Sequence, residues 1–364
     1  MKRPTSYSTR CFEGEREKRR RKLAVVVAAL LCAFFGVFAG GASVPPGTVV
    51  MSGLDNPRHL AFGPEGALYV AEAGRGGPGP CLFLRGATQC AGSSGAVSRL
   101  WHGAQSRIVT GLPSYAPAGG GGATGPHAVS LHGLGNGYVT IGLAGNLTTR
   151  ATMGQGFGRT ARFQPNGKWG YEDDIAGYEQ ENNPDGNVPD SNTYAILAEP
   201  GQRVITDAGG NDLLRVRANG SISTLAVFPA RPGRSTDAVP TSVAVGPDGA
   251  YYVGELSGAP FNANDAHIYR VVPGQPVQTY GPTFSFIIDL AWGPDGHLYV
   301  LQFASLPGLT GPGILYRLEA DGTKAPVVTD LIAPGGVTFG PDGALYISNR
   351  SVLAGAGEVL RFEP

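Results

Sequence analysis

The stretch Gly63-Pro-Glu-Gly-Ala-Leu-Tyr-Val recurs three more times along the chain. Close copies, with Asp in place of Glu, begin at Gly246, Gly293 and Gly340. A Pro-Asp-Gly sequence supplies the residues that a tight turn requires, and the apolar residues on either side are typical of short strands. Four copies of one turn-and-strand unit predict a protein built from internal repeats.

Two weaker copies, at 135–139 and 199–205, raise the number of repeat units to six. The Tyr-Val pair or its equivalent falls at positions 69, 138, 204, 252, 299 and 346, so the first two units are about 20 residues longer than the others. A pair of Arg and an apolar residue follows in every unit and confirms the number. These pairs begin at Arg99, Arg162, Arg215, Arg270, Arg317 and Arg361. Units of 45 to 50 residues with four short strands are typical of β-propeller blades.

The two ends of the repeat region are complementary. The chain stops just after the sixth Arg-apolar strand, one strand short of a complete unit, while 48–54 has the pattern of the missing strand and precedes the first unit. We therefore predict an all-β, six-bladed propeller of four-stranded blades over residues 46–364, with the N-terminal strand pairing with the last blade. Pairing of this kind hides two sheet edges. A row of independent β modules is the competing interpretation.

Residues 1–42 have the pattern of an export signal. Basic residues dominate the first 22 positions, an uncharged stretch runs from Leu23 to Ala42, and small residues precede a plausible cleavage point at Ser43. The segment is either cleaved or retained as a membrane anchor, and both outcomes place the repeats outside the cytoplasm. Cys81 and Cys90 are the one cysteine pair after this segment, so we expect a disulfide in an oxidising compartment.

Composition argues against nucleic acid as a partner. Charged residues make up 15% of the chain and its formal net charge is zero, so no basic surface is indicated. We expect a small molecule, a glycan or a protein to bind at one mouth of the propeller channel. Contact with a membrane is expected only through residues 1–42, if that segment is retained.

Several motifs resemble the ScyD/ScyE family, which is named after genes beside a cyanobacterial pigment pathway and whose members have no assigned reaction. The motifs are Asp55-Asn-Pro-Arg-His-Leu-Ala-Phe-Gly-Pro, Asn183-Pro-Asp-Gly, Asp190-Ser-Asn-Thr-Tyr, Asp207-Ala-Gly-Gly-Asn and the stretch 239–256. The paired cysteines also fit this family, whereas Thr193 stands where it usually has Pro. More distantly, the repeats are similar to NHL and gluconolactonase-like propellers, some of which hold an axial metal ion.

Polar residues recur at one position of the repeat, two after the Val of each Tyr-Val pair. They are Glu72, Asp207, Glu255, Gln302 and Asn349, with Ile141 as the exception. If the second strand of each blade runs near the channel, these side chains gather around the axis, where carboxylates would attract a hard cation such as Ca²⁺. The alternative is strand-end polarity that faces channel water. Arg58 and His127 occupy equivalent positions and could neutralise the carboxylates instead.

Further channel-mouth candidates lie around the Asn- and Asp-rich stretch 183–194. Asp190, Asn192, Asn211 and Asp289 are expected to contact a ligand, although turns shaped by Asp and Asn side chains are the simpler interpretation of this stretch. Its spacing differs from that of an EF-hand, because Val188 is sixth and Tyr194 stands where a bidentate Glu would be needed.

Three functions are compatible with these residues. The first is a non-catalytic propeller that binds a ligand or partner outside the cytoplasm. The second is a calcium-dependent lactonase-like or esterase-like hydrolase, with His127 as a candidate proton-transfer residue; against it, Asn56-Pro-Arg stands where the gluconolactonase pattern has Glu-Gly-Pro. The third, handling of a pigment or phenolic compound, follows only from the family resemblance.

Overall fold

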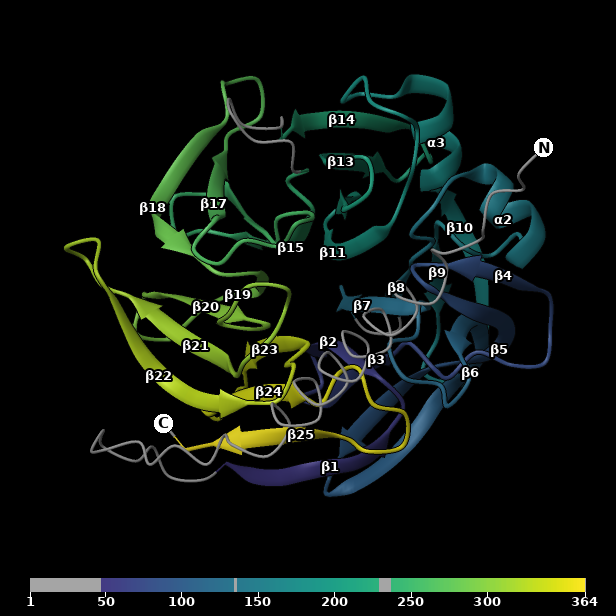
Figure 1. Ribbon diagram of the computed structural model, residues 1–364. Helices are drawn as coiled ribbons and strands as arrows, with labels where there is room; N and C mark the ends of the chain where they lie inside the picture. Colours follow the sequence, from purple (N-terminus) through teal and green to yellow (C-terminus); the bar gives the residue numbers. More distant parts are fainter. Residues whose placement is uncertain (1–46, 134–135, 229–236, 364) are drawn as a thin grey trace, which may run out of the picture. The chain divides into compact units, whose positions relative to one another are not determined.

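The computed structural model describes residues 47–133, 136–228 and 237–363, which form a ring of six antiparallel blades (Figure 1). This confirms the predicted fold class. The predicted export segment, residues 1–42, lies outside the described residues. No helix in the described part of the chain is long and apolar enough to cross a membrane.

The blades follow one another along the chain, and blades 2 to 5 use their strands in sequence order. Blade 1 contains β2 (Pro57–Phe62), β3 (Leu68–Glu72), β5 (Ala87–Trp101) and β6 (Ala104–Pro117), with β4 (Cys81–Leu84) added to β5. Blade 2 contains β7 (Pro126–Leu131), β8 (Gly137–Ile141), β9 (Arg159–Phe163) and β10 (Trp169–Asp174). Blade 3 contains β11 (Thr193–Glu199), β12 (Gln202–Asp207), β13 (Asp212–Arg217) and β14 (Ile222–Val227).

The remaining three blades are more regular. Blade 4 contains β15 (Pro240–Val245), β16 (Tyr251–Glu255), β17 (Ala266–Val271) and β18 (Gln278–Phe284). Blade 5 contains β19 (Ile287–Trp292), β20 (Leu298–Gln302), β21 (Gly313–Leu318) and β22 (Lys324–Leu331). Blade 6 contains β23 (Gly336–Phe339), β24 (Leu345–Asn349), β25 (Gly357–Phe362) and β1 (Thr48–Leu54).

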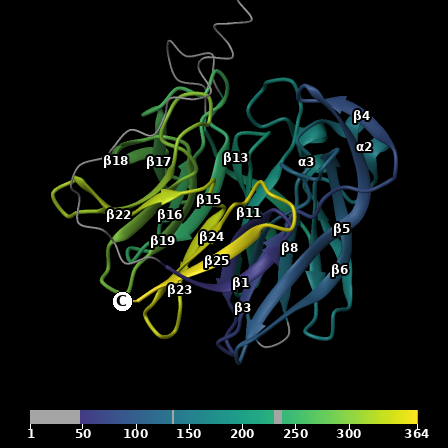
Figure 2. The same cartoon turned by 60° about the horizontal axis from the view of Figure 1, so that its bottom comes forward.

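The ring closes as the sequence predicts. β1 and β25 run antiparallel at the outer edge of blade 6, with Thr48 opposite Arg361 and Leu54 opposite Gly357 (Figures 1 and 2). One blade therefore combines the first described strand with the last. This pairing covers an edge of β25 and an edge of β1 that would otherwise be open to another chain.

The first strand of each blade lies nearest the centre of the ring. Contacts between first strands run from β2 to β7, β11, β15, β19 and β23 and back to β2. The assumption that the second strand lines the channel is therefore wrong. The ends of β3, β12, β16, β20 and β24, which carry the predicted metal ligands, lie one strand further out.

The repeated turn motif has a structural role, which blades 4 and 6 show. In blade 4 the Asp248 carboxylate accepts hydrogen bonds from the hydroxyl of Tyr252 (3.3 Å) and from Arg270 Nε (2.8 Å), so the turn is tied to the second and third strands. The same arrangement joins Asp342 to the Tyr346 hydroxyl and to Arg361. The Tyr and Arg that mark every full repeat thus stabilise the blade, on the face where the first strand ends and the second begins.

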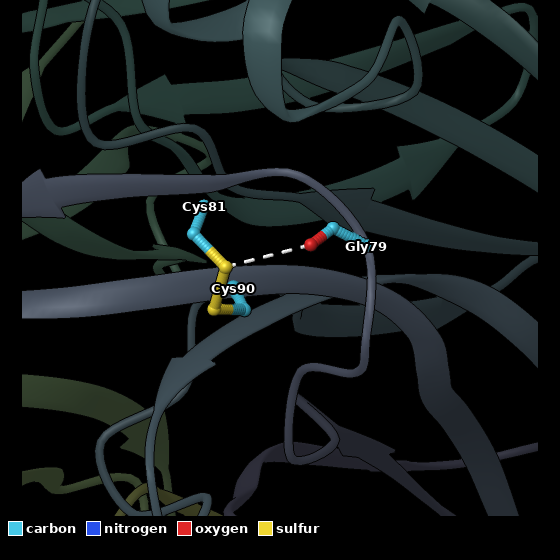
Figure 3. Close-up of a disulfide and its surroundings, with 3 residues drawn as sticks. All are labelled: Gly79, Cys81 and Cys90. Atoms are coloured by element: carbon cyan, nitrogen blue, oxygen red, sulfur yellow. Dashed lines mark hydrogen bonds between the residues drawn. A yellow bond between two sulfur atoms is a disulfide. The ribbon is translucent and has the colours of Figure 1, made fainter.

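The additional residues of the first two units form extensions of the blades. In blade 1 they form β4 and the long β5–β6 pair, and the Cys81–Cys90 disulfide joins β4 to β5, as predicted (Figure 3). In blade 2 they form two helices that the repeat pattern did not predict, α2 (Leu147–Met153) and α3 (Ile175–Asn182). Each helix begins at a capping side chain, Asn146 for α2 and Asp174 for α3, which accepts hydrogen bonds from the first turn.

Candidate ligand site at the channel mouth

The candidate site lies where the first strands begin and the second strands end. The strand registers place Pro57 opposite Glu72, Pro126 opposite Ile141 and Thr193 opposite Asp207. The residue after each of these inner-strand positions is structurally equivalent from blade to blade. Around the ring, this position holds Arg58, His127, Tyr194, Thr241, Ile288 and Gly336. Blades 1 to 3 thus place one cation and two polar aromatic rings on adjacent inner strands.

His127 contacts two residues of blade 3, Thr193 and Tyr194. Its ring packs against that of Tyr194, with the centroids 4.5 Å apart, and its Nδ1 lies 3.2 Å from the carbonyl oxygen of Thr193. A Cβ atom on Gly142 would lie 2.6 Å from both His127 Nδ1 and Asn192 Oδ1. The absence of a side chain at Gly142 therefore leaves room for His127 and Asn192 to approach the same point. The buried Asn192 Oδ1 has no hydrogen-bond partner.

Arg58 contributes a positive charge, and no carboxylate of the described residues forms an ion pair with it. One terminal nitrogen donates a hydrogen bond to the carbonyl oxygen of Ala123 (2.8 Å), while the buried Nε has no partner. Burial lowers the pKa of Arg58, the Tyr194 hydroxyl acts against this, and the positive charge of Arg85 adds to it. A guanidinium stays charged despite such shifts. The site therefore holds a largely uncompensated cation.

His127 is neutral at physiological pH. Burial, followed by the charge of Arg58, lowers the pKa of the His127 imidazole to about 3. Burial also raises the pKa of the Tyr194 phenol, so this side chain keeps its proton. The site thus combines a fixed positive charge with neutral groups that can donate or accept hydrogen bonds.

Asp289 lies on the inner strand of blade 5 and is linked to His59 of blade 1. It is buried and accepts hydrogen bonds from the backbone amides of Leu290 (2.9 Å) and Val337 (2.8 Å). Its Oδ2 lies 3.7 Å from His59 Nε2, and the other ring nitrogen of His59 has no partner. Burial raises the pKa of the Asp289 carboxyl, against the effect of His59. Asp289 therefore belongs to a His–Asp contact and forms no ion pair with Arg58.

The other predicted mouth residues lie toward blade 3. Asn211 donates hydrogen bonds to Asp185 Oδ2 (2.9 Å) and to the carbonyl oxygen of Gly209 (3.1 Å), and it accepts one from the amide of Val239. It therefore ties loops together. Asp190 is solvent-exposed, and burial of part of its carboxyl, followed by the charge of Asp207, raises its pKa to about 6.

The five predicted metal ligands do not converge on the axis. Each binds groups of its own blade. Each of the five side chains accepts a hydrogen bond from a backbone amide. The donors are Asp55 for Glu72 (2.7 Å), Asn192 for Asp207 (2.6 Å), His267 for Glu255 (2.8 Å), Ser285 for Gln302 (2.9 Å) and Ile332 for Asn349 (2.8 Å). Nowhere in 47–133, 136–228 or 237–363 do three or more His, Cys, Asp or Glu side chains form a group suited to a metal ion. These residues therefore do not fit an axial metal, and calcium stays a prediction.

Two residues of the site were missed by the sequence analysis. Tyr194 could have been found by aligning the starts of the inner strands, because it is equivalent to Arg58 and His127. His59 gives no such signal, since its contact with Asp289 joins blades 1 and 5, which lie on either side of blade 6. On the opposite face, a mainly apolar cavity of about 210 Å³ lies between blades 1 and 2, beside Tyr69, Trp101 and Phe163, away from these polar groups.

The comparisons with known proteins show the fold and no family. No protein-family profile and no curated protein sequence matches the chain. Similar solved structures include an α-L-arabinanase from Penicillium chrysogenum complexed with arabinobiose (12% identity, 88% of this chain and 99% of the other, TM-score 0.53) and a proposed gluconolactonase (14%, 91% and 97%, TM-score 0.52). A streptogramin B lyase is 15% identical over 88% of this chain and 95% of its own, with a TM-score of 0.48.

Proposed function

We propose that this protein is an exported, ScyD/ScyE-like binding propeller whose channel mouth takes a small hydroxylated carboxylate. The observation that carries the proposal is the Arg58 guanidinium, which is largely buried and has no carboxylate partner among the described residues. A buried charge without a counter-charge is costly, so a ligand that supplies an anion would recover that cost. The exported location is supported by the disulfide, since such bonds persist in oxidising compartments.

The hydroxyl groups of the ligand follow from the neutral part of the site. Asn192 is partly exposed and its Oδ1 is an unpartnered acceptor 2.6 Å from the position that a Gly142 Cβ would take. A ligand hydroxyl can donate to this oxygen while the carboxylate of the same ligand pairs with Arg58. The His127–Tyr194 pair provides an apolar wall with polar edges between them. Hydroxy acids and sugar acids have this combination of groups.

The test compares ligands that carry one or both groups. We expect calorimetry to detect binding of gluconate, weaker binding of acetate, which lacks the hydroxyls, and of glucose, which lacks the charge. Arg58→Met should weaken gluconate binding about 10- to 100-fold, because a hydrogen bond to a charged group contributes about 1.5–3 kcal/mol. Arg317→Met, which changes a partly exposed arginine in blade 5 outside the mouth site, is the matched control. Equal affinity of wild type and Arg58→Met for gluconate, or no binding by either, would overturn the proposal.

A hydrolase remains the second candidate, and the His59–Asp289 contact favours it. A carboxylate beside one ring nitrogen can orient an imidazole so that the other nitrogen takes up a proton, and the Nδ1 of His59 is unpartnered. Turnover of lactone or ester substrates that is lost in His59→Gln and retained in Arg317→Met would support this activity. If hydroxy acids bind but no lactone or ester is turned over, only the binding function is supported.

A further inference from the structure

A second group of polar side chains lies between α3 and the β12–β13 pair of blade 3, and it adjoins the mouth site where the Asn192 amide donates a hydrogen bond to Asp207. Asp207 and Asp212 face one another across the β12–β13 pair, and both are fully buried. Glu179 of α3 is also buried, and its Oε2 would lie 2.8 Å from a Cβ atom on Gly210, while Asp207 Cγ would lie 3.6 Å from the same atom. The missing side chain of Gly210 therefore allows an acidic side chain of the helix to approach the acidic end of the sheet.

The hydrogen bonds of these acids are unequal. Asp207 is fully satisfied, because it accepts hydrogen bonds from the Ser191 hydroxyl (2.6 Å) and from the amides of Asn192 and Gly209. Asp212 is the opposite case, since neither of its carboxylate oxygens has a partner although the side chain is completely buried. Glu179 Oε1 and the amide oxygen of Asn183, at the C-terminal cap of α3, are also buried and unpartnered.

The surroundings of Asp212 supply negative charge only. The charges that act on it come from Asp207, Glu179 and Asp185, and those that act on Glu179 come from Asp207, Asp185 and Asp190. No described Arg, Lys or His forms an ion pair with Glu179 or Asp212. The carbonyl end of α3 adds further negative potential at Asn183. Glu179 and Asp212 thus bring unpartnered carboxylate oxygens to one buried region, and no described basic side chain pairs with either.

We infer that a hard cation, with Ca²⁺ as the first to test, binds between the end of α3 and the β12–β13 pair. Asp212, Glu179 and the amide oxygen of Asn183 are the side-chain ligands, and backbone carbonyls and water complete the shell. Calcium takes six to eight oxygen ligands of these kinds. The site differs from an axial one, since it lies between α3 and the sheet of blade 3, and it would fix the helix to that sheet.

The experiment uses the full-length chain in mild detergent, stripped with a chelator and then titrated with calcium chloride. We expect one bound calcium per wild-type chain by elemental analysis, and a rise of about 5 °C in the unfolding temperature at a calcium concentration of about 100 times the dissociation constant. Asp212→Asn keeps the shape and removes the charge, so it should bind no calcium and show no rise. The matched control is Asp321→Asn, an exposed change in blade 5 that should behave as wild type.

The calcium-free proteins show whether a bound cation or protonation alone neutralises the carboxylates. Without calcium, Asp212→Asn should be more stable than wild type, because it removes repulsion; with calcium, the order should reverse. If calcium neither binds to wild type nor stabilises it, or if it stabilises Asp212→Asn equally, the inference is wrong. Should Asp212→Asn not fold, Glu179→Gln provides the same comparison. Arg58→Met should retain the calcium effect, so failure of the ligand proposal would leave this result untouched.

Discussion

The rings of His127 and Tyr194 lie with their centroids 4.5 Å apart and their planes inclined by 36°, and Gly142 leaves the space beside them open. The pair joins the inner strands of blades 2 and 3. This pairing depends on Gly142, which directly follows β8 and has no side chain. The position of the imidazole, and with it the shape of the mouth, is thus decided partly by a glycine that touches no ligand.

We expect Gly142→Ala to disturb the mouth site. The added methyl group would overlap His127 and Asn192, and overpacking of this kind typically costs about 1–3 kcal/mol. Gluconate binding, measured by calorimetry, should weaken at least tenfold. Gly170→Ala is the control, because a Cβ atom at Gly170 meets nothing within 4 Å. Equal affinity in the two variants would show that the His127 position is not needed for binding.

Arg58→Met should stabilise the protein while it weakens binding. The unpartnered Nε and the absence of a carboxylate make the guanidinium a poor contributor to folding, and apolar replacements of buried charges are often neutral or stabilising. Urea unfolding would measure the free energy of unfolding of the ligand-free protein. A large loss of stability in Arg58→Met would show that Arg58 serves the fold, and its place in a binding site would then lose support.

His127 should make the protein less stable in acid. Its pKa is about 3 in the folded state and near 6.5 in the unfolded state, so between these values the unfolded chain binds the additional proton. The contribution is therefore fully present above pH 6.5 and is lost progressively as the pH falls toward 3. Unfolding curves at several pH values should show a shallower decline for His127→Asn than for wild type. Parallel curves would contradict this assignment.

Loss of the disulfide should loosen one hairpin and leave the ring intact. Cys81 and Cys90 are nine residues apart and join β4 to β5, and β4 pairs with no other strand (Figure 3). In the double Ser variant we expect faster amide hydrogen exchange over 82–89. The exchange of β3 amides should change little, because β3 pairs with residues 96–100 of β5, beyond the residues 87–90 that pair with β4. Global acceleration of exchange would show that the hairpin supports the whole blade.

The sequence predicted the repeats far better than the site. The Gly-Pro-Asp-Gly and Arg markers were sufficient for six blades because each performs the same task, as the Asp248–Tyr252–Arg270 contacts show. The same regularity led to the wrong prediction that the second strand of each blade lies nearest the channel. Residues at one repeat position were expected to meet at the axis, yet Glu72 and Asp207 bind loop amides in separate blades.

Contacts between non-equivalent positions could not be predicted. Glu179 reaches Asp207 and Asp212 from a helix that no other blade contains, and His59 meets Asp289 from two blades away. Neither pair has a counterpart elsewhere in the sequence. Arg58 and His127 were candidates because each precedes its Tyr-Val pair by the same interval, and Asn192 was one because it lies in the Asn- and Asp-rich stretch 183–194.

Closure of blade 6 by β1 also sets the order in which the chain can mature. Blades 1 to 5 each use a continuous stretch, so a chain emerging from the ribosome can assemble them one after another. β1 is synthesised before all of them, and its partner β25 is among the last strands made. Until β25 has been made, β1 lacks the strand with which it pairs. A nascent chain interrupted before Gly357 would have five complete blades and an incomplete sixth. It would expose two unpaired strand edges, which could pair with other chains.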